Sequence, residues 1–320
     1  GWNGIRFYYT NPFADSTILE HCIFFYGKAL STDSLRNHGG AICIRNFNKV
    51  RISHCQFNSN HASLNGGALY LEDANIIVKH SVFSHNSCGP SVDPYGYGGA
   101  VCIDHSNACI LDNTFGHNTS TGVGGAVAVR FHDSRICNNS FSDNFSALGG
   151  AIGYLHYYEN HYSQCNNLFV ANASAFFGGA IANIDAGPLF ANNTIAYNYS
   201  VYGGGFYVKD SLVPDVYNCI FWGNFASGFG NQVYLWDSYS SANFYYSDIQ
   251  GGWEQFAGSG GGAGYTGIYE NNIETNPMFT DTINTDLTLT AESPCMNSGI
   301  PDTTGLMLYN SCLGGNPRII

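Results

Sequence analysis

Four charged residues occupy one equivalent position in successive repeats of the chain, at the end of a short apolar run that follows a pair of glycines. They are Arg45, Glu72, Asp104 and Arg130. If these repeats stack directly, Glu72 and Asp104 lie about 5 Å apart, and such a like-charge contact can raise one carboxyl pKa and produce an acid/base pair. The two arginines oppose that effect. We therefore expect an outward-facing charge ladder, with catalysis as the weaker hypothesis.

Other sequence features of a polysaccharide-cleaving enzyme do not accompany these carboxylates. The chain has no Asp-Asp pair, no Gly-His-Gly and no Arg-Ile-Lys, which a polygalacturonase-like site would need. A pectate-lyase-like site needs clustered aspartates for Ca²⁺ and a basic proton acceptor, and the sequence has no convincing copy of that set. A polysaccharide lyase or glycoside hydrolase is therefore the alternative function, with Glu72 and Asp104 as its weak catalytic candidates.

The eleven cysteines form no CxxC pair and no zinc-binding pattern, so we expect no metal and no cofactor. Their odd number leaves at least one unpaired. They are either buried thiols or, in an oxidising compartment, partners in disulfides. Stacking of the repeats would bring together Cys22–Cys55 and Cys137–Cys165 at a separation that suits a disulfide. Cys295–Cys312 would close the terminal loop, on spacing alone.

Aromatic residues become frequent after the regular repeats fade. Trp222, Tyr234, Trp236 and Tyr239 are candidates for stacking on sugar rings or packing against another protein. The alternative for each of them is ordinary packing within the fold. The sequence does not separate these two roles.

The composition excludes several classes of protein. With 22 Tyr, 22 Phe and only 11% charged residues, the chain is too aromatic for a disordered protein. Its formal net charge of −12 would repel a phosphate backbone, so nucleic acid is not an expected partner. No apolar run reaches the ~20 residues that cross a bilayer, so we expect no transmembrane segment.

The repeat itself has two landmarks that keep the same period. Glycine pairs begin at Gly39, Gly66, Gly98, Gly124, Gly149, Gly178 and Gly203. The second landmark is Phe-x-x-Asn, with an isoleucine at position 195. Its apolar members are Phe57, Phe83, Phe115, Phe141, Phe169, Ile195 and Phe221, and its asparagines are Asn60, Asn86, Asn118, Asn144, Asn172, Asn198 and Asn224.

Residues between the landmarks alternate with the period of a strand, as in Leu69 and Leu71, and show no helical stripe. Short strands in a repeat near 26 residues predict an all-β fold, a right-handed parallel β-helix with three strands per coil and about eight to ten coils. We expect residues 1–249 to form the coils, and residues 250–320 to form an irregular final coil and a loop-rich C-terminal cap of the same domain. The phenylalanines would stack in the core, and the asparagines would form a ladder of amide hydrogen bonds.

These motifs carry a resemblance to known families. The Gly-Gly-Ala-[Ile/Leu/Val] and Phe-x-x-Asn pair resembles the repeats of chlamydial polymorphic outer-membrane proteins and of many secreted bacterial parallel β-helix proteins. The C-terminal part resembles surface-anchored β-helix proteins with a choice-of-anchor module, in the motifs NCIFWGN, YYSDIQGG, NPMFTD, LTLTAESPCMNSG and GGNPRII. The resemblance implies a secreted, extracellular or cell-surface location.

The function that these observations favour is structural. We expect an exported surface or extracellular protein, either adhesin-like or self-assembling into a filament or sheath, because a stiff rod with few charges and many aromatic residues favours lateral or end-to-end contacts. Its partner would be another copy or a surface component. The alternative is a carbohydrate-active enzyme or a glycan-binding β-helix, whose partner would be a polysaccharide.

Overall fold

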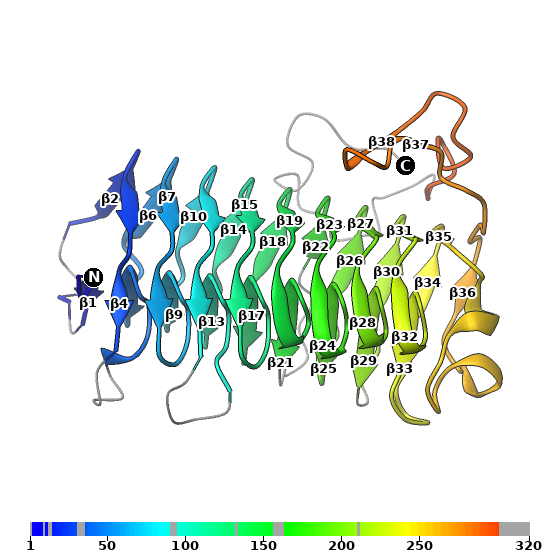
Figure 1. Ribbon diagram of the computed structural model, residues 1–320, viewed down its shortest axis with the longest axis horizontal. Coiled ribbons are helices and arrows are strands. Elements are labelled where there is room, and N and C mark those ends of the chain that lie inside the picture. The colour runs from blue at the N-terminus through cyan, green and yellow to red at the C-terminus, as the bar shows by residue number, and fades with distance from the viewer. Residues whose placement is uncertain are drawn as a thin grey trace.

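The computed structural model describes residues 2–8, 10–11, 15–30, 36–89, 95–131, 134–155, 163–209 and 212–300. Over these residues the chain winds into a parallel β-solenoid whose coils stack along one long axis (Figure 1). The predicted class of fold is therefore confirmed. The described residues contain short strands and 3₁₀ turns but no α-helix. In this part of the chain no helix has the length and hydropathy that a membrane span requires.

Sheets 1 and 2 are formed by the first two strands of each coil. Sheet 1 contains β1 (Ile5–Phe7), β5 (Ile42–Arg45), β9 (Leu69–Glu72), β13 (Val101–Asp104), β17 (Val127–Arg130), β21 (Ile152–Leu155), β25 (Ile181–Ile184), β29 (Phe206–Lys209) and β33 (Val233–Leu235). Sheet 2 contains β2 (Thr17–Glu20), β6 (Val50–Ser53), β10 (Ile77–Lys79), β14 (Cys109–Leu111), β18 (Arg135–Cys137), β22 (Ser163–Cys165), β26 (Leu189–Ala191), β30 (Asp215–Tyr217), β34 (Asn243–Tyr245) and β36 (Tyr269–Glu270).

Sheets 3 and 4 complete the coil. Sheet 3 contains β3 (Ile23–Phe25), β7 (Gln56–Asn58), β11 (Val82–Ser84), β15 (Thr114–Gly116), β19 (Ser140–Ser142), β23 (Leu168–Val170), β27 (Thr194–Ala196), β31 (Ile220–Trp222) and β35 (Asp248–Ile249). Sheet 4 contains β4 (Lys28–Ala29), β8 (His61–Ala62), β12 (Ser87–Cys88), β16 (Thr119–Ser120), β20 (Phe145–Leu148), β24 (Ala173–Phe177), β28 (Tyr199–Tyr202) and β32 (Phe225–Phe229).

The fourth sheet is an addition to the three strands per coil that the sequence predicts. Its strands have only two residues in the early coils, as in β8, and a strand of two residues carries no alternating pattern that could reveal it. The strands lengthen to five residues in β24 and β32. Eight coils contribute a strand to this sheet.

Sharp corners between the sheets depend on single residues with left-handed backbone. In the coil of β13, these residues are His105, Asp112 and His117, with φ of 46°, 56° and 56°. Asn, Asp and His tolerate this conformation better than other non-glycine residues. The turn from sheet 4 back to sheet 1 uses the glycine pair, because Gly98 has a φ of 70° and a Cβ on Gly99 would collide with the carbonyl oxygen of Gly125 in the next coil.

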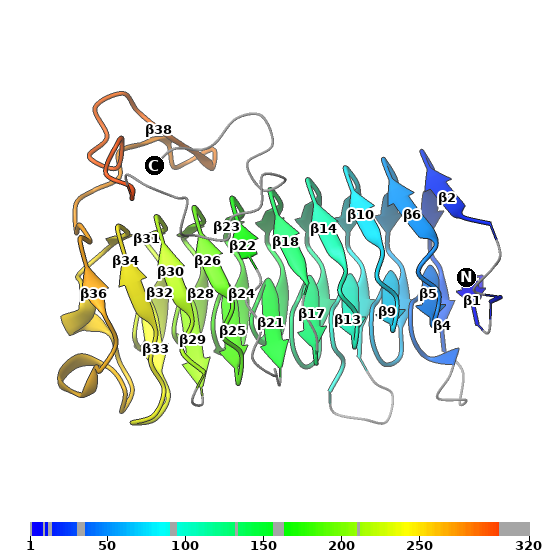
Figure 2. The ribbon, with the colours of Figure 1, turned by 180° about the vertical axis from the view of Figure 1, so that it is seen from behind.

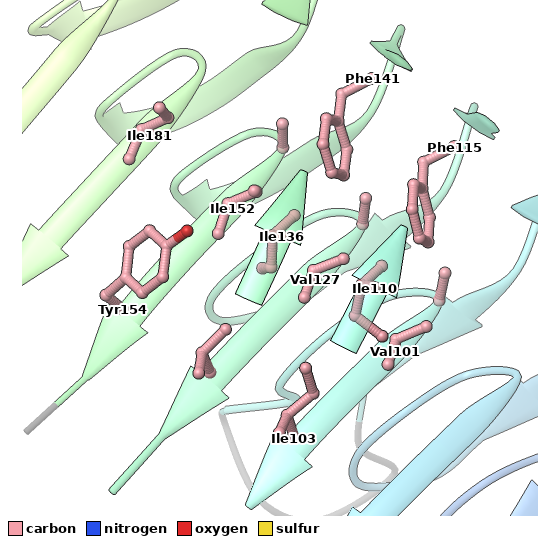
Figure 3. Close-up of a cluster of buried hydrophobic side chains, with 14 of the residues drawn as sticks. Val101, Ile103, Ile110, Phe115, Val127, Ile136, Phe141, Ile152, Tyr154 and Ile181 are labelled. Carbon is pink, nitrogen blue, oxygen red and sulfur yellow. The ribbon is translucent and has the colours of Figure 1, made fainter. Parts of the chain in front are cut away.

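Phenylalanine rings fill one side of the interior in a stack that runs from Phe24 to Phe169. Phe115 lies 4.9 Å from Phe83 and 4.9 Å from Phe141, measured between ring centroids, with interplanar angles of 11° and 7°. Figure 3 shows Phe115 and Phe141 side by side, facing the isoleucines and valines of sheets 1 and 2. Ile195 interrupts the stack, and Phe221 follows it in the same register.

Asparagine side chains form a hydrogen-bonded ladder inside the corner between sheets 3 and 4. Asn118 donates from Nδ2 to the carbonyl oxygen of Phe83 at 2.9 Å and to Oδ1 of Asn144 at 3.0 Å. Its own Oδ1 accepts from the backbone N–H and from Nδ2 of Asn86, each at 3.0 Å. The same pattern runs from Asn60 to Asn224. The ladder therefore satisfies polar groups that the tight corner would otherwise leave buried without partners.

The chain after β35 covers the C-terminal side of the coils in two ways. The 3₁₀ turns η2 (Trp253–Gln255) and η3 (Gly262–Gly264) lie at the end of the solenoid, where Phe256 packs on Phe244 with ring centroids 5.1 Å apart. The antiparallel hairpin of β37 (Phe279–Asp281) and β38 (Asp286–Leu289) lies beside the coils instead, against outward residues of sheet 3 (Figures 1 and 2). The open end is thus closed by the first of these segments.

Replacing Phe115 by alanine should destabilise the solenoid by about 3–5 kcal/mol, because it leaves a cavity between two stacked rings. A matched control is Phe145→Ala, since Phe145 is 47% exposed on sheet 4 and its loss should cost less than about 1 kcal/mol. Guanidinium unfolding followed by circular dichroism measures both. Equal losses in the two variants would contradict the importance of the interior stack.

Asn118→Ala should cost about 3 kcal/mol of unfolding free energy, since the buried carbonyl of Phe83 and the N–H of Asn86 lose their partners. Asn107 is exposed in the corner between sheets 1 and 2 of the same coil, and Asn107→Ala should change stability by no more than about 0.5 kcal/mol. Guanidinium unfolding followed by circular dichroism measures both variants. A mild effect in Asn118→Ala would mean that water or neighbouring amides replace the ladder.

Candidate functional site

The outer face of sheet 1 brings the four charged residues of the repeat into one file. Register pairs Arg45 with Glu72, Glu72 with Asp104, and Asp104 with Arg130. Each residue ends its strand and points away from the core. The four side chains are therefore neighbours in space, although Arg45 and Arg130 lie far apart in the sequence.

Glu72 is held by the arginine of the preceding coil. Nε of Arg45 lies 3.0 Å from Oε2 of Glu72. The guanidinium also lies over the rings of Tyr8 and Tyr70, at 5.7 and 5.3 Å from their centroids. Arg45 is therefore fixed by both charge and cation–π contact.

Asp104 is enclosed more tightly and is only 7% exposed. Its Oδ2 accepts hydrogen bonds from Nη1 of Arg130 at 3.1 Å and from the hydroxyl of Tyr70 at 3.0 Å, and Oδ1 lies 3.0 Å from Nδ1 of His105. Burial raises the pKa of Tyr70, so this phenol stays protonated and donates. Arg130 in turn lies 4.5 Å from the ring centroid of Tyr97.

This arrangement favours a structural charge ladder over an acid/base pair. Glu72 has an arginine partner, and both oxygens of Asp104 contact a donor or a histidine. A catalytic acid or base needs an oxygen that can reach a substrate proton. Catalysis by Glu72 and Asp104 stays a hypothesis that the geometry does not favour.

The residue directly before each glycine pair covers the outer face of sheet 1 in the next coil. Val123 lies over Gly153, where any Cβ would collide with the valine side chain. Phe177 packs on Tyr207 with ring centroids 4.7 Å apart, and Tyr202 packs on Tyr234 at 5.2 Å. The covered residue of sheet 1 is thus small in a middle coil, as at Gly153, and aromatic in the later coils, as at Tyr207 and Tyr234.

These contacts create an aromatic cluster at the edge between sheets 4 and 1, which we call the aromatic corner. It consists of Phe177, Tyr202, Tyr207, Phe229, Tyr234 and Trp236. The indole of Trp236 meets the ring of Phe177 edge-on, with centroids 5.3 Å apart. Tyr207 is buried beneath the cluster, whereas Trp236 is 41% and Phe229 is 67% exposed.

The aromatic corner has the chemistry of a stacking platform. Its backbone is rigid, because the N–H of Trp236 donates to the carbonyl of Val208 at 3.0 Å. Burial raises the pKa of Tyr234, so its phenol remains neutral and available as a hydrogen-bond donor. Exposed aromatic faces beside neutral hydroxyls suit sugar rings or the apolar surface of a protein. Tyr239, three residues beyond Trp236, is 79% exposed in a turn that Asp237 closes.

Trp222 lies elsewhere, on the outer face of sheet 3. There it packs with Ile220 and Cys295, beneath residues of the C-terminal hairpin. The four aromatic candidates of the sequence therefore do not form one site. The sequence interpretation also missed Phe177, Tyr202 and Phe229, although the first two stand directly before a glycine pair and Phe229 stands before the single Gly230 at the equivalent position. That column was the signal that could have found them.

The predicted cysteine pairs occupy adjacent coils. Cys137 and Cys165 are direct partners in sheet 2, and their Sγ atoms lie 2.7 Å apart. Cys22 and Cys55 are thiols, whose Sγ atoms donate to the carbonyls of Glu20 and Ser53. Both disulfides stay predictions for the oxidised protein. Cys295–Cys312 cannot be placed, since Cys312 lies outside the described residues.

The junction between the last coil and the C-terminal segment contains a buried carboxyl group. Asp248 is 2% exposed. Its Oδ1 accepts from the N–H of Thr275 at 3.1 Å, and its Oδ2 accepts from the thiol of Cys295 at 3.1 Å. Burial raises the pKa of Asp248 to about 6. We therefore expect the attachment of the C-terminal segment to depend on pH.

Comparison with known proteins gives one match. The model of the Chlamydia polymorphic membrane protein repeat matches residues 54–72, a stretch that contains Phe57, Asn60 and the glycine pair at Gly66. No curated protein and no solved structure matches the chain. This match supports the resemblance of the repeats to those of chlamydial polymorphic outer-membrane proteins, over residues 54–72 of the solenoid.

Asp248→Asn should change how stability depends on pH. The unfolded carboxyl titrates near ~3.9, whereas the folded one holds its proton up to a pH of about 6. The stability that Asp248 contributes is therefore full below the unfolded pKa and is lost as the pH rises through the folded value. In Asp248→Asn this loss should be absent.

Thermal midpoints measured from pH 4 to pH 7 check this expectation. Asp73→Asn is the control, since Asp73 is exposed at a left-handed corner where asparagine fits. The control should follow the wild-type curve. If Asp248→Asn followed it too, the buried carboxyl would have no part in the pH response.

Proposed function

We propose that this chain is the stiff, non-enzymatic body of an exported surface protein with an adhesin-like role, and that the aromatic corner makes the adhesive contact. The observation that carries the proposal is the exposure of Trp236 and Phe229 beside half-buried aromatic rings that pack on the buried ring of Tyr207. Monomeric soluble proteins rarely expose apolar groups together, and such patches mark interaction sites.

The rest of the fold supports a role in which the rod holds the aromatic corner ready for a binding partner. The Phe stack and the Asn ladder give each coil the same contacts with the next, so the rod holds the aromatic corner in one geometry. A preorganised aromatic surface binds with little loss of side-chain entropy. Trp and Tyr are also the residues that contribute most often to binding energy at interfaces.

A surface location is supported by the family match. The matched repeat belongs to proteins described as polymorphic membrane proteins of Chlamydia, and we extend to this chain the exposure at a cell surface that this description suggests. The net charge of −12 fits a protein that must remain soluble and repel other acidic surfaces. The paired carboxylates Glu72 and Asp104 give no competing support for an enzyme.

A glycan is a second candidate for the partner. The indole of Trp236 meets Phe177 edge-on and lies 6.5 Å from the ring of Tyr234 between centroids, and an indole near a tyrosine suits the apolar face and the hydroxyls of a pyranose. Assembly of copies into a filament or sheath would use the same surface against another solenoid. Binding and assembly experiments therefore distinguish a glycan partner from another protein or a second copy of this chain.

The test combines location and binding. Antibodies against the folded chain should label intact producing cells without permeabilisation. Purified protein should bind intact host cells or members of a glycan panel, and Trp236→Ala should weaken that binding about tenfold or more. Phe25→Ala is the matched control, since Phe25 is 44% exposed at the opposite end of the rod, and it should bind as the wild type does.

Other outcomes would overturn the proposal. Labelling only after permeabilisation would contradict a surface location, and equal binding by Trp236→Ala would contradict the role of the aromatic corner. Release of unsaturated or reducing ends from the glycan panel, lost in Glu72→Ala or Asp104→Ala, would establish the enzyme instead. Regular polymers in electron micrographs that vanish in Trp236→Ala would identify the filament or sheath form.

A further inference from the structure

One column of corner residues changes its chemistry along the solenoid. It consists of the single left-handed residue that follows each strand of sheet 2. In the later coils this position is mostly asparagine, and in the first three it is histidine. The members with left-handed backbone are His21, His54, His80, Asp112, Asn138, Asn166, Asn192, Asn218, Tyr246 and Asn271.

The asparagines of this column serve the fold. Nδ2 of Asn166 donates to Oδ1 of Asn138 at 3.1 Å, and Nδ2 of Asn218 donates to Oδ1 of Asn192 at 3.1 Å. Left-handed backbone and a chain of amide hydrogen bonds are both satisfied by asparagine. Histidine also tolerates this backbone, but it replaces the amide with ring nitrogens that can bind a metal.

The three histidines form a stack of imidazole rings at the N-terminal end of the rod, near β2, β6 and β10 (Figure 1). Ring centroids are 5.0 Å apart between His21 and His54, and 5.0 Å apart between His54 and His80. His21 and His54 are exposed. Their nitrogens are thus open to solvent and to dissolved ions.

A carboxylate lies beside the first two rings. Glu20 ends strand β2, and its Oε1 lies 3.6 Å from Nδ1 of His54. The hydroxyl of Ser53 donates to the same oxygen at 3.1 Å, which holds the carboxylate in place. One potential ligand atom from each of Glu20, His21 and His54 lies within 4.8 Å of the other two.

We propose that Glu20, His21 and His54 bind a divalent transition-metal ion of the zinc class. Two imidazoles and one carboxylate are a donor set that Zn²⁺ accepts, with its remaining position taken by water. Mg²⁺ and Ca²⁺ prefer sites made of oxygen ligands, so they should bind poorly. The hydrogen bond from Ser53 acts as the outer contact that orients a ligating carboxylate.

The ligand atoms come from two coils, and this has a physical consequence. Glu20 ends strand β2, His21 follows it, and His54 follows β6, so a bound ion would link the first two strands of sheet 2. Binding to the folded chain alone adds stability as the concentration of free ion rises above the dissociation constant. The site would therefore fasten the N-terminal coil, independently of what the aromatic corner binds.

The test is calorimetric titration of the full chain with ZnCl₂, after removal of any histidine tag and under reducing conditions. We expect one ion per chain and a rise in thermal midpoint with added Zn²⁺. His21→Asn, His54→Asn and Glu20→Gln should each weaken binding about tenfold or more. Asparagine keeps the corner intact, because later coils carry it at the same position.

The chain offers a matched control in a second pair of stacked histidines. His85 and His117 have left-handed φ of 55° and 56° and ring centroids 4.9 Å apart. Among the described residues they belong to no group of three donors within reach. The double variant His85→Asn/His117→Asn should bind Zn²⁺ as the wild type does, and titration with MgCl₂ should give no heat of binding.

Several results would overturn the proposal. These are absence of Zn²⁺ binding by the wild type, unchanged binding by both His21→Asn and His54→Asn, and equal weakening in the His85→Asn/His117→Asn control. Cys22 lies two residues from Glu20 and donates to its carbonyl. Loss of binding in Cys22→Ser would place the ion on that thiol and would contradict the donor set.

Discussion

Each coil of this protein lies directly on the coil before it, in register, and this constraint determines almost every other feature. Parallel pairing aligns equivalent residues through sheets of eight to ten strands, so the neighbour of any side chain is its counterpart one repeat away. A residue type is then selected for how well it contacts its own kind. Rings stack on rings in the core, and amides bond to amides in the corners.

Residues on the outer surface are also aligned from coil to coil, but they do not have to be of the same type. A position that faces solvent is free to change from coil to coil, so its column can carry a charge ladder over one part of the rod and aromatic residues over another. On sheet 1 the column of Arg45 and Glu72 carries the charge ladder in the early coils, and the neighbouring outward column carries Tyr207 and Tyr234 in the later ones. The corner column on sheet 2 changes from histidine to asparagine. Surface columns that depart from their own repeat are therefore where function is to be sought in such a fold.

The sequence predicted the parallel solenoid, because the glycine pairs and the Phe-x-x-Asn motif recur with a common period. It also predicted that Glu72 and Asp104 lie in one file. It did not reveal sheet 4, whose early strands are too short to alternate. It did not reveal the packing of Phe177 on Tyr207, or the meeting of Glu20 with His54, because these contacts join different positions of adjacent coils. A search for like residues in equivalent positions cannot find contacts that cross from one column to another.

The asparagine ladder has a direction. Each amide donates from Nδ2 to the Oδ1 of the following coil, from Asn60 onward, and Asn224 ends the series by donating to Oε1 of Gln232. Because every internal unit presents an acceptor to the unit before it and a donor to the unit after it, a whole unit can be duplicated or deleted without disturbing this polarity. Gene-level gain or loss of complete repeats would then alter only the length of the molecule, by about 4.8 Å for each one. The length of the solenoid is thus a property that evolution can adjust in uniform steps.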